Sequence, residues 1–105
     1  MKNVVATKEA PAAIGPYSQA IEYNGVLYVS GQIPVNPKSG AVEADTIEGQ
    51  AEQSLKNVGA ILREAGLTYE NVLKTTCFIA DMGDFAKFNE VYAKYFKEDA
   101  PARSC

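Results

Sequence analysis

The stretch IEGQAEQSLKNVGAILREAG, residues 47–66, decides the fold because its pattern is that of an amphipathic helix. Apolar residues recur in it at spacings of three and four, and charged residues fall between them. The apolar positions are Ile47, Ala51, Leu55, Val58, Leu62 and Ala65. Asp45 can supply an N-cap oxygen with Glu48 three residues later, and Gly66 can adopt the left-handed conformation that ends a helix. We therefore expect a helix that is capped at Asp45 and ends before Gly66.

Three β-rich stretches precede this helix, at residues 3–6, 17–23 and 26–30. Asn24-Gly25 joins the second stretch to the third and is a strong signal for a two-residue hairpin turn. The sequence therefore predicts a hairpin and one further short strand before the helix.

The chain after the helix predicts a strand, a second helix and the beginning of another strand. Residues 72–80 are β-branched and aromatic enough for a strand, and the helix before them predicts a right-handed crossover from 26–30. Either Asp81 or Asp84 can cap the second helix, and residues 102–105 read as a strand. The apolar stripe of that helix is Phe85, Phe88, Tyr92, Tyr95 and Phe96. The fold class that follows is α+β, a mixed β-sheet with two helices packed on one face.

This sheet has apolar side chains on both faces, as residues 26–29 and 77–79 show. Two helices can cover only one face, so we expect another copy of the chain to cover the other in a closed homo-oligomer. The alternative is a sheet that curls into a small barrel.

Length and composition indicate a single domain over residues 1–105. The net charge of −3 and the pI of about 4.9 disfavour a nucleic-acid partner, since phosphate contacts need clustered Lys and Arg. No apolar run approaches a membrane span and no signal peptide begins the chain, so we expect a cytoplasmic protein without membrane contact. Cys77 and Cys105 match no metal spacing and no dense disulfide framework, so we expect reduced thiols.

Histidine is absent, which excludes Ser-His and Cys-His nucleophiles and argues against a metal centre. No glycine-rich phosphate loop is present, so we expect no cofactor. The remaining candidates for an anion site are Tyr17, Ser30, Asn89 and Arg103.

Each candidate has a structural alternative. The guanidinium of Arg103 would bind either a ligand carboxylate or an internal Asp or Glu. The amide of Asn89 lies on the aromatic stripe and would join a structural network or line a pocket. Tyr17 follows a rigid Gly-Pro turn, which would aim its hydroxyl at a fixed point or bury it in the core. Ser30 and Gly31 end a strand, where they form a binding rim or only a turn.

Three short segments also stand out by their order and spacing. They are Gly15-Pro16-Tyr17-Ser18-Gln19-Ala20, Ser30-Gly31-Gln32-Ile33-Pro34 and Pro101-Ala102-Arg103-Ser104-Cys105. Together they closely resemble the RidA family of reactive-intermediate deaminases. The similarity runs from end to end of the chain and includes Lys74-Thr75-Thr76.

The resemblance implies a chorismate-mutase-like α+β fold that forms a homotrimer with sites between subunits. It implies hydrolysis of 2-iminopropanoate or 2-iminobutanoate to a 2-keto acid and ammonia, with Arg103 holding the substrate carboxylate. Catalytic roles are then expected for Arg103, Tyr17 and Ser30. Substrate binding is expected for Arg103, Gly31, Asn89, Cys105 and Tyr17, with backbone groups acting at Gly31 and Cys105. No metal is expected.

One departure from the family pattern concerns the end of the sequence. RidA proteins continue for about twenty residues beyond the Pro-Ala-Arg-Ser-Cys segment, with further strand that would otherwise leave a sheet edge exposed. That extension also supplies a glutamate that orients the attacking water. We therefore expect either that the printed sequence is incomplete or that this acid is absent and activity is reduced.

Two rival functions follow from the same residues. The first is a small-molecule binding or regulatory module that recognises a carboxylate without reacting with it. The second is a ribonuclease or translation inhibitor, activities ascribed to some similar proteins. The acidic balance of the chain disfavours the second.

Overall fold

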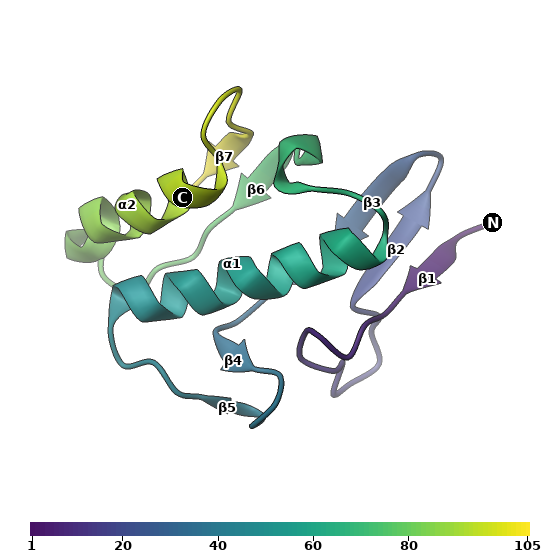
Figure 1. The fold of residues 1–105 in the computed structure, drawn as a ribbon, viewed down its shortest axis with the longest axis horizontal. Helices are drawn as coiled ribbons and strands as arrows, with labels where there is room; N and C mark the ends of the chain where they lie inside the picture. The colour runs from purple at the N-terminus through teal and green to yellow at the C-terminus, as the bar shows by residue number, and fades with distance from the viewer.

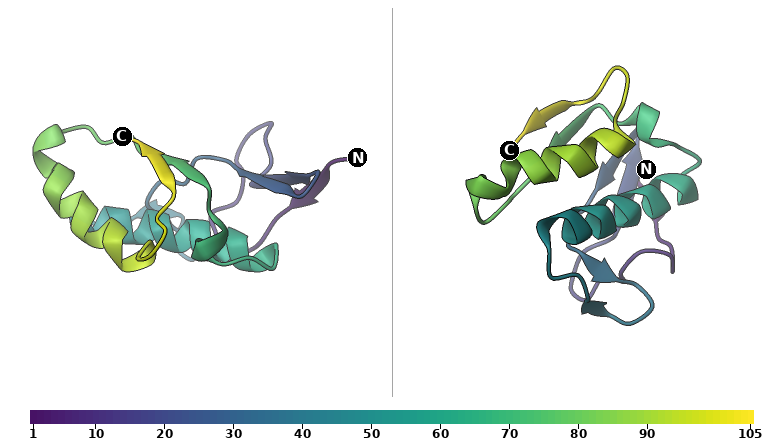
Figure 2. Two further views of the ribbon diagram at one scale, coloured as in Figure 1. Left: turned by 90° about the horizontal axis from the view of Figure 1, so that it is seen from above. Right: turned by 60° about the vertical axis from the view of Figure 1, so that its left-hand side comes forward.

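The computed structural model describes residues 1–105, and its α1 helix lies at the centre of the molecule (Figure 1). In chain order the elements are β1 (Asn3–Val5), β2 (Ala20–Tyr23), β3 (Val26–Val29), β4 (Val35–Asn36), β5 (Ala41–Val42), α1 (Ile47–Glu64), the 3-10 turn η1 (Tyr69–Asn71), β6 (Lys74–Thr76), the 3-10 turn η2 (Met82–Asp84), α2 (Phe85–Tyr95) and β7 (Ala102–Ser104). Seen from above, α1 and α2 lie to one side of the strands β1–β3, β6 and β7 (Figure 2). The α+β class with two helices is confirmed.

The α1 helix is capped by Thr46, one residue later than the predicted Asp45. Thr46 has an extended backbone, and its hydroxyl accepts a hydrogen bond from the Gly49 N–H at 3.1 Å. Gly66 ends the helix as expected, with a φ of 77° and an N–H that donates to the Arg63 carbonyl at 3.0 Å.

The predicted hairpin joins β2 to β3 through Asn24 and Gly25. Both residues have positive φ, at 52° and 77°, as a type I′ turn requires. Tyr23 pairs with Val26 across the turn, and β1 adds to the free edge of β2 in antiparallel fashion. The hairpin and the additional short strand are therefore confirmed.

The strand predicted over residues 72–80 is shorter than expected, and it does not share a sheet with β3 as the predicted crossover requires. Only β6 forms a ladder, because Val72 closes the η1 turn and residues 78–80 pair with no strand. β6 pairs in parallel with β7 rather than with β3. Three separate sheets, ordered β1-β2-β3, β4-β5 and β6-β7, therefore replace the single mixed sheet that was expected.

The entry to α2 uses Asp81 rather than Asp84. The Asp81 carboxylate accepts a hydrogen bond from the Gly83 N–H at 2.8 Å and so holds η2, which runs directly into α2. Asp84 precedes α2 but makes no side-chain cap bond.

Two apolar clusters hold the helices to the strands. The larger lies between α1 and α2 and consists of Ala51, Leu55, Phe88, Val91, Tyr92 and Phe96. The smaller joins α1 to the hairpin sheet and consists of Ala10, Ala20, Ala60 and Ile61, with Leu27 and Val29 of β3 packed against it. The predicted stripes supply Ala51 and Leu55 of α1 and Phe88, Tyr92 and Phe96 of α2 to the larger cluster. They missed Val91 of α2 and the α1 residues Ala60 and Ile61, which form a second buried face of α1 toward the hairpin sheet.

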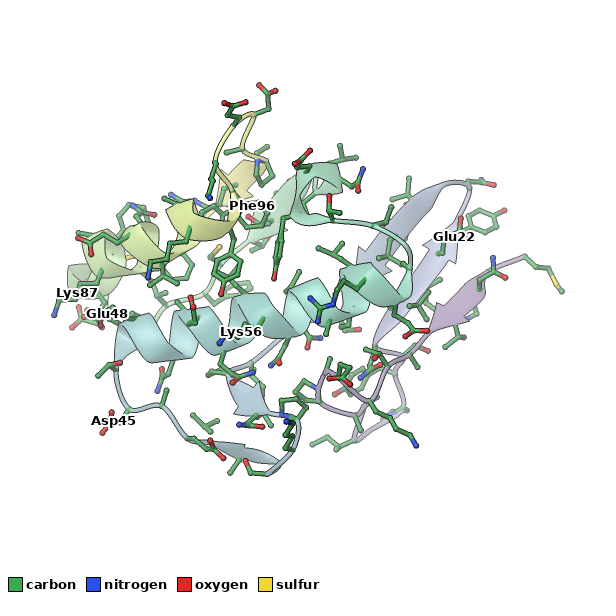
Figure 3. All side chains as sticks on the ribbon, viewed as in Figure 1. Glu22, Asp45, Glu48, Lys56, Lys87 and Phe96 are labelled. Carbon is green, nitrogen blue, oxygen red and sulfur yellow. The ribbon has the colours of Figure 1, made fainter.

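Other surfaces of these elements are exposed. Glu48 and Lys56 on α1 and Lys87 on α2 carry charge into solvent (Figure 3). On β3, Val26 and Tyr28 are exposed while the alternate residues face the core, so one side of this sheet stays uncovered by helix. Neither helix combines the length and apolar character that crossing a bilayer demands.

Asn57 connects α1 to the segment that follows β3. Its side chain is 1% exposed, and its amide donates to the carbonyls of Ile33 (3.1 Å) and Val35 (2.9 Å). The Gln53 amide donates in turn to the Asn57 side-chain oxygen at 2.9 Å. This buried network fixes the backbone just beyond Gly31, which belongs to the predicted binding rim.

We expect Asn57→Ala to lower the free energy of unfolding by about 2 kcal/mol or more, because the carbonyls of Ile33 and Val35 lose the buried amide that donates to them. Urea unfolding monitored by circular dichroism measures this change. The control is Gln53→Ala, which removes a less buried partner and should cost less. Equal costs for the two variants would contradict the role given to Asn57.

Candidate functional site

Arg103 lies in the middle of β7, on the side that faces α2. In the parallel ladder Arg103 stands beside Thr75 of β6. Both residues are half-buried, whereas their neighbours in each strand are exposed. Because side chains alternate along a strand, this pattern directs Thr75 and Arg103 toward α2.

The Arg103 guanidinium is held by one amide and two aromatic rings. Its Nη1 donates to the Asn89 side-chain oxygen at 2.8 Å. Its central carbon lies 4.7 Å from the centroid of the Tyr92 ring and 5.3 Å from that of Phe85. Such cation–π contacts orient a guanidinium without neutralising it. The internal salt bridge that the sequence left open is absent, since the partners are an amide oxygen and two ring faces.

The three partners of Arg103 share one face of α2. Phe85, Asn89 and Tyr92 stand at positions i, i+4 and i+7, which stack along a helix. The Asn89 amide therefore joins a network, and that network orients the candidate cation. The sequence predicted only a core position for the Phe85 and Tyr92 rings. Their spacing around Asn89 was the signal that both rings could also contact a guanidinium.

Tyr92 is also tied to β6 through its hydroxyl. The hydroxyls of Tyr92 and Thr75 lie 2.7 Å apart. Burial raises the pKa of the Tyr92 phenol, and the Thr75 hydroxyl opposes that rise. Tyr92 is therefore neutral at physiological pH and serves as a ring platform and hydrogen-bond partner.

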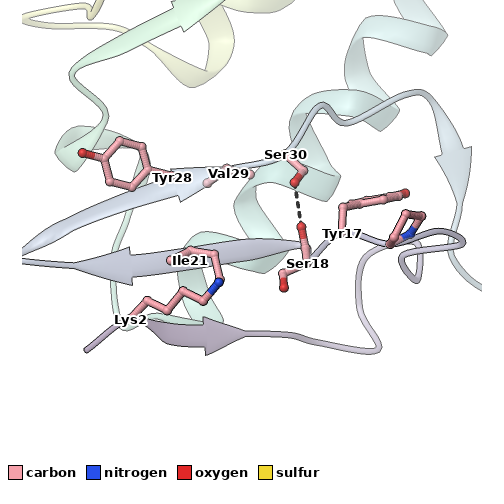
Figure 4. Close-up of a pocket in the computed structure, with 8 residues that line it drawn as sticks. Lys2, Tyr17, Ser18, Ile21, Tyr28, Val29 and Ser30 are labelled. Atoms are coloured by element: carbon pink, nitrogen blue, oxygen red, sulfur yellow. Dashed lines mark hydrogen bonds between the residues drawn. The ribbon is translucent and has the colours of Figure 1, made fainter.

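A second group of predicted residues lies around the end of β3. Tyr17 and Ser30 line an open pocket of about 370 Å³ together with Lys2, Pro16, Ser18, Ile21, Tyr28 and Val29 (Figure 4). The Ser30 hydroxyl donates to the Ser18 carbonyl at 2.6 Å, which fixes its position at the rim. Gly31 follows in the exposed backbone, with nothing within 4 Å of the place where a Cβ would stand. The backbone at Gly31 is thus open to a ligand.

Tyr17 does not begin a strand as predicted. Its N–H donates to the Gly15 carbonyl at 2.8 Å, so the Gly-Pro segment closes a tight turn there and β2 begins only at Ala20. The ring is 52% exposed, which rules out the alternative of a core tyrosine.

Gln19, in the same sequence segment, has a structural role that the sequence did not reveal. The residue is 5% exposed, and its amide donates to the Pro11 carbonyl at 2.7 Å while its oxygen accepts from the Thr7 N–H at 2.7 Å. It therefore holds the 7–11 loop against the start of the hairpin sheet.

The predicted site residues thus fall into two groups in one chain. Arg103 of β7 contacts Asn89 of α2, and the exposed Cys105 lies just after β7. Tyr17, Ser30 and Gly31 lie at the hairpin sheet, and the pocket there is lined by none of the α2 and β7 residues. In Figure 1, β7 lies above α2, which sits near the start of α1. The β2–β3 hairpin lies near the end of α1.

Residues 7–105 match the family described as Endoribonuclease L-PSP. This chain belongs to that family. The 2-iminobutanoate/2-iminopropanoate deaminase of Homo sapiens is 46% identical over 104 residues, which cover 99% of this chain and 76% of the human protein. The resemblance to RidA proteins is therefore confirmed.

Solved structures of the family share the fold of this chain. The structure of a protein of the Rid family from Yersinia pestis is 51% identical, with a TM-score of 0.96 over 99% of this chain and 83% of that one. The structure of E. coli TdcF with bound serine is 45% identical, with a TM-score of 0.92 over 98% of this chain and 83% of that one.

We expect Tyr92→Phe to lower the free energy of unfolding by about 1 kcal/mol, since the Thr75 hydroxyl loses its partner. Tyr92→Leu should lower it by about 2–4 kcal/mol, because the ring is lost as well.

The raised pKa of Tyr92 predicts how stability depends on pH. The contribution of the neutral Tyr92 phenol to the free energy of unfolding is fully present below its ordinary pKa of 10.0. This contribution is lost as the pH rises through the higher pKa that Tyr92 has in the folded protein. Urea unfolding from pH 7 to 11 should therefore show wild type losing stability relative to Tyr92→Phe above about pH 10. A constant difference between the two would contradict this placement.

Proposed function

We propose that this protein hydrolyses small 2-imino acids to 2-keto acids and ammonia, with Arg103 binding the substrate carboxylate. The observation that carries the proposal is the set of partners around this guanidinium. It is half-buried and oriented, yet one amide and two rings leave its charge unneutralised. A planar carboxylate matches the remaining N–H groups with two parallel hydrogen bonds.

The proposed reaction requires little from the protein beyond positioning. Water adds to the carbon of the C=N bond. The C–N bond of the resulting adduct then breaks, ammonia departs, and the carbon becomes a keto group. Imines hydrolyse readily in water, so positioning and modest acid–base help would suffice, on the order of 10²–10⁴-fold or roughly 3–5 kcal/mol. The Tyr17 and Ser30 hydroxyls would hold the water, and the backbone at Gly31 and Cys105 would hold the substrate.

We further propose that a complete site forms between copies of the chain in a chorismate-mutase-like homotrimer. Two observations support this. The Arg103 and Tyr17 groups lie apart in one chain, so a cleft that uses both needs a second copy. Large apolar side chains are also exposed, with Leu73 at 76%, Phe78 at 92% and Tyr28 at 63%, and an interface would cover them.

The names of relatives support the same chemistry. The human relative is named for the deamination of two short 2-imino acids, and the E. coli TdcF structure holds serine. An α-amino acid and a 2-imino acid share a carboxylate next to a carbon that bears nitrogen. Arg103 is the residue of this chain that we expect to recognise that shared carboxylate.

Two rival functions differ from imine hydrolysis in what they require of the chain. A binding module without catalysis would bind keto acids through Arg103 and show no turnover. The family name instead refers to RNA cleavage, but a net charge of −3 disfavours a polyanionic substrate. Imine hydrolysis is therefore the function to test first.

We expect Arg103→Ala to lower kcat/KM for imine hydrolysis by about 100-fold or more, equivalent to about 3 kcal/mol, because the charge-assisted pair with the carboxylate is lost. Arg103→Lys keeps the charge without the planar fork and should retain an intermediate rate. The assay generates the imine with an amino-acid oxidase and follows release of the keto acid.

The matched control for this assay is Arg63→Ala, which removes an exposed arginine near the end of α1. Its rate should equal that of wild type. The proposal fails if wild type does not accelerate hydrolysis, or if the two alanine variants lose activity equally.

A further inference from the structure

The two cysteines of the chain are neighbours across the β6–β7 ladder. Thr76 pairs with Ser104 in parallel register. The Cys77 N–H then donates to the Ser104 carbonyl at 2.8 Å, which carries the ladder one residue past the end of β6. The next position on each strand is a cysteine, so Cys77 and Cys105 stand side by side.

The geometry of a sheet suits a covalent link at this position. Adjacent strands lie about 4.7–4.9 Å apart, and a disulfide needs Cα atoms about 4.4–6.8 Å apart. Directly opposite residues also point to the same side of a sheet. Cys77 lies two residues after Thr75 and Cys105 two residues after Arg103, so both belong to the side that faces α2.

The surroundings of the Cys77 thiol are consistent with a close partner. Burial raises the pKa of Cys77, the Thr75 hydroxyl at 4.0 Å from its sulfur opposes that rise, and the Cys105 thiol adds to it. Cys77 is half-buried and Cys105 is exposed, so the pair combines an accessible thiol with a sheltered one.

We propose that Cys77 and Cys105 are a redox-active dithiol that hydrogen peroxide converts into a reversible intramolecular disulfide. The Cys105 thiolate attacks a peroxide oxygen and the O–O bond breaks. Cys105 becomes a sulfenic acid, and the departing hydroxide takes up the proton that the Cys105 thiol released, which gives water. The Cys77 thiolate then attacks the Cys105 sulfur, the S–O bond breaks, and the departing hydroxide takes up the proton that the Cys77 thiol released, which gives a second water. Two thiols and one peroxide thus give one disulfide and two waters, and a reducing thiol reverses the link.

This modification site does not depend on the proposed deaminase activity. It rests on the register of β6 and β7 and on the presence of a cysteine at each of the two positions that continue the ladder. A link there would tie β7 to β6 two residues beyond Arg103, at the border of the candidate acid-binding site.

The experiment oxidises the whole protein with equimolar hydrogen peroxide, blocks remaining thiols with an alkylating agent, and maps disulfides by mass spectrometry after digestion. We expect both thiols to be lost together and a peptide containing Cys77 to be joined to one containing Cys105. Dithiothreitol should restore both. Isotope-labelled and unlabelled chains that are unfolded and refolded together before oxidation should give links within chains only.

Single substitutions separate the two chemical steps. In Cys77→Ser, Cys105 should stop at the sulfenic acid and react with dimedone, whereas wild type should give at least tenfold less dimedone adduct. In Cys105→Ser, Cys77 should remain reduced. The proposal is overturned if both thiols stay alkylatable in wild type, if links join separate chains, or if dimedone labels Cys105 equally in wild type and Cys77→Ser.

Discussion

The parallel pairing of β6 with β7 is the constraint on which the candidate site depends. It places Arg103 beside Thr75 on the side that faces α2, where its guanidinium reaches Asn89 and the Tyr92 ring. A slip of one residue in this register would turn Arg103 to the exposed side, because successive side chains of a strand point in opposite directions. The same register brings Cys77 next to Cys105, so the acid-binding residue and the proposed dithiol share one structural origin.

Charge explains why this arrangement favours a ligand. A half-buried guanidinium that lacks a carboxylate is costly to desolvate, and the amide and rings offset only part of that cost. The carboxylate of a small organic acid would pair with the guanidinium. Its charge is opposite, so binding it buries no second positive charge. The Tyr17 and Ser30 group offers hydroxyls rather than charge, which suits the placing of a water. The two groups supply different parts of the same proposed reaction.

The sequence predicted the features that depend on neighbouring residues and missed those that depend on distant ones. The α1 helix and the Asn24-Gly25 hairpin were predictable because periodicity, caps and turn residues are local signals. The partner of residues 72–80 was not, since β-propensity says that a strand forms and not which strand it joins. The motif residues of the site were likewise identifiable, but their separation into two groups in one chain follows from the fold.

In the proposed homotrimer, Arg103 of one chain and the Tyr17 and Ser30 hydroxyls of another form one site. A complementation experiment tests this arrangement. Inactive Arg103→Ala chains and inactive Tyr17→Ala/Ser30→Ala chains are unfolded together in equal amounts, refolded, and assayed for imine hydrolysis. Random assembly with sites between subunits restores about a quarter of the sites, so the mixture should be active although neither parent is. A mixture in which native mass spectrometry shows mixed oligomers, yet which stays as inactive as its parents, would contradict the account.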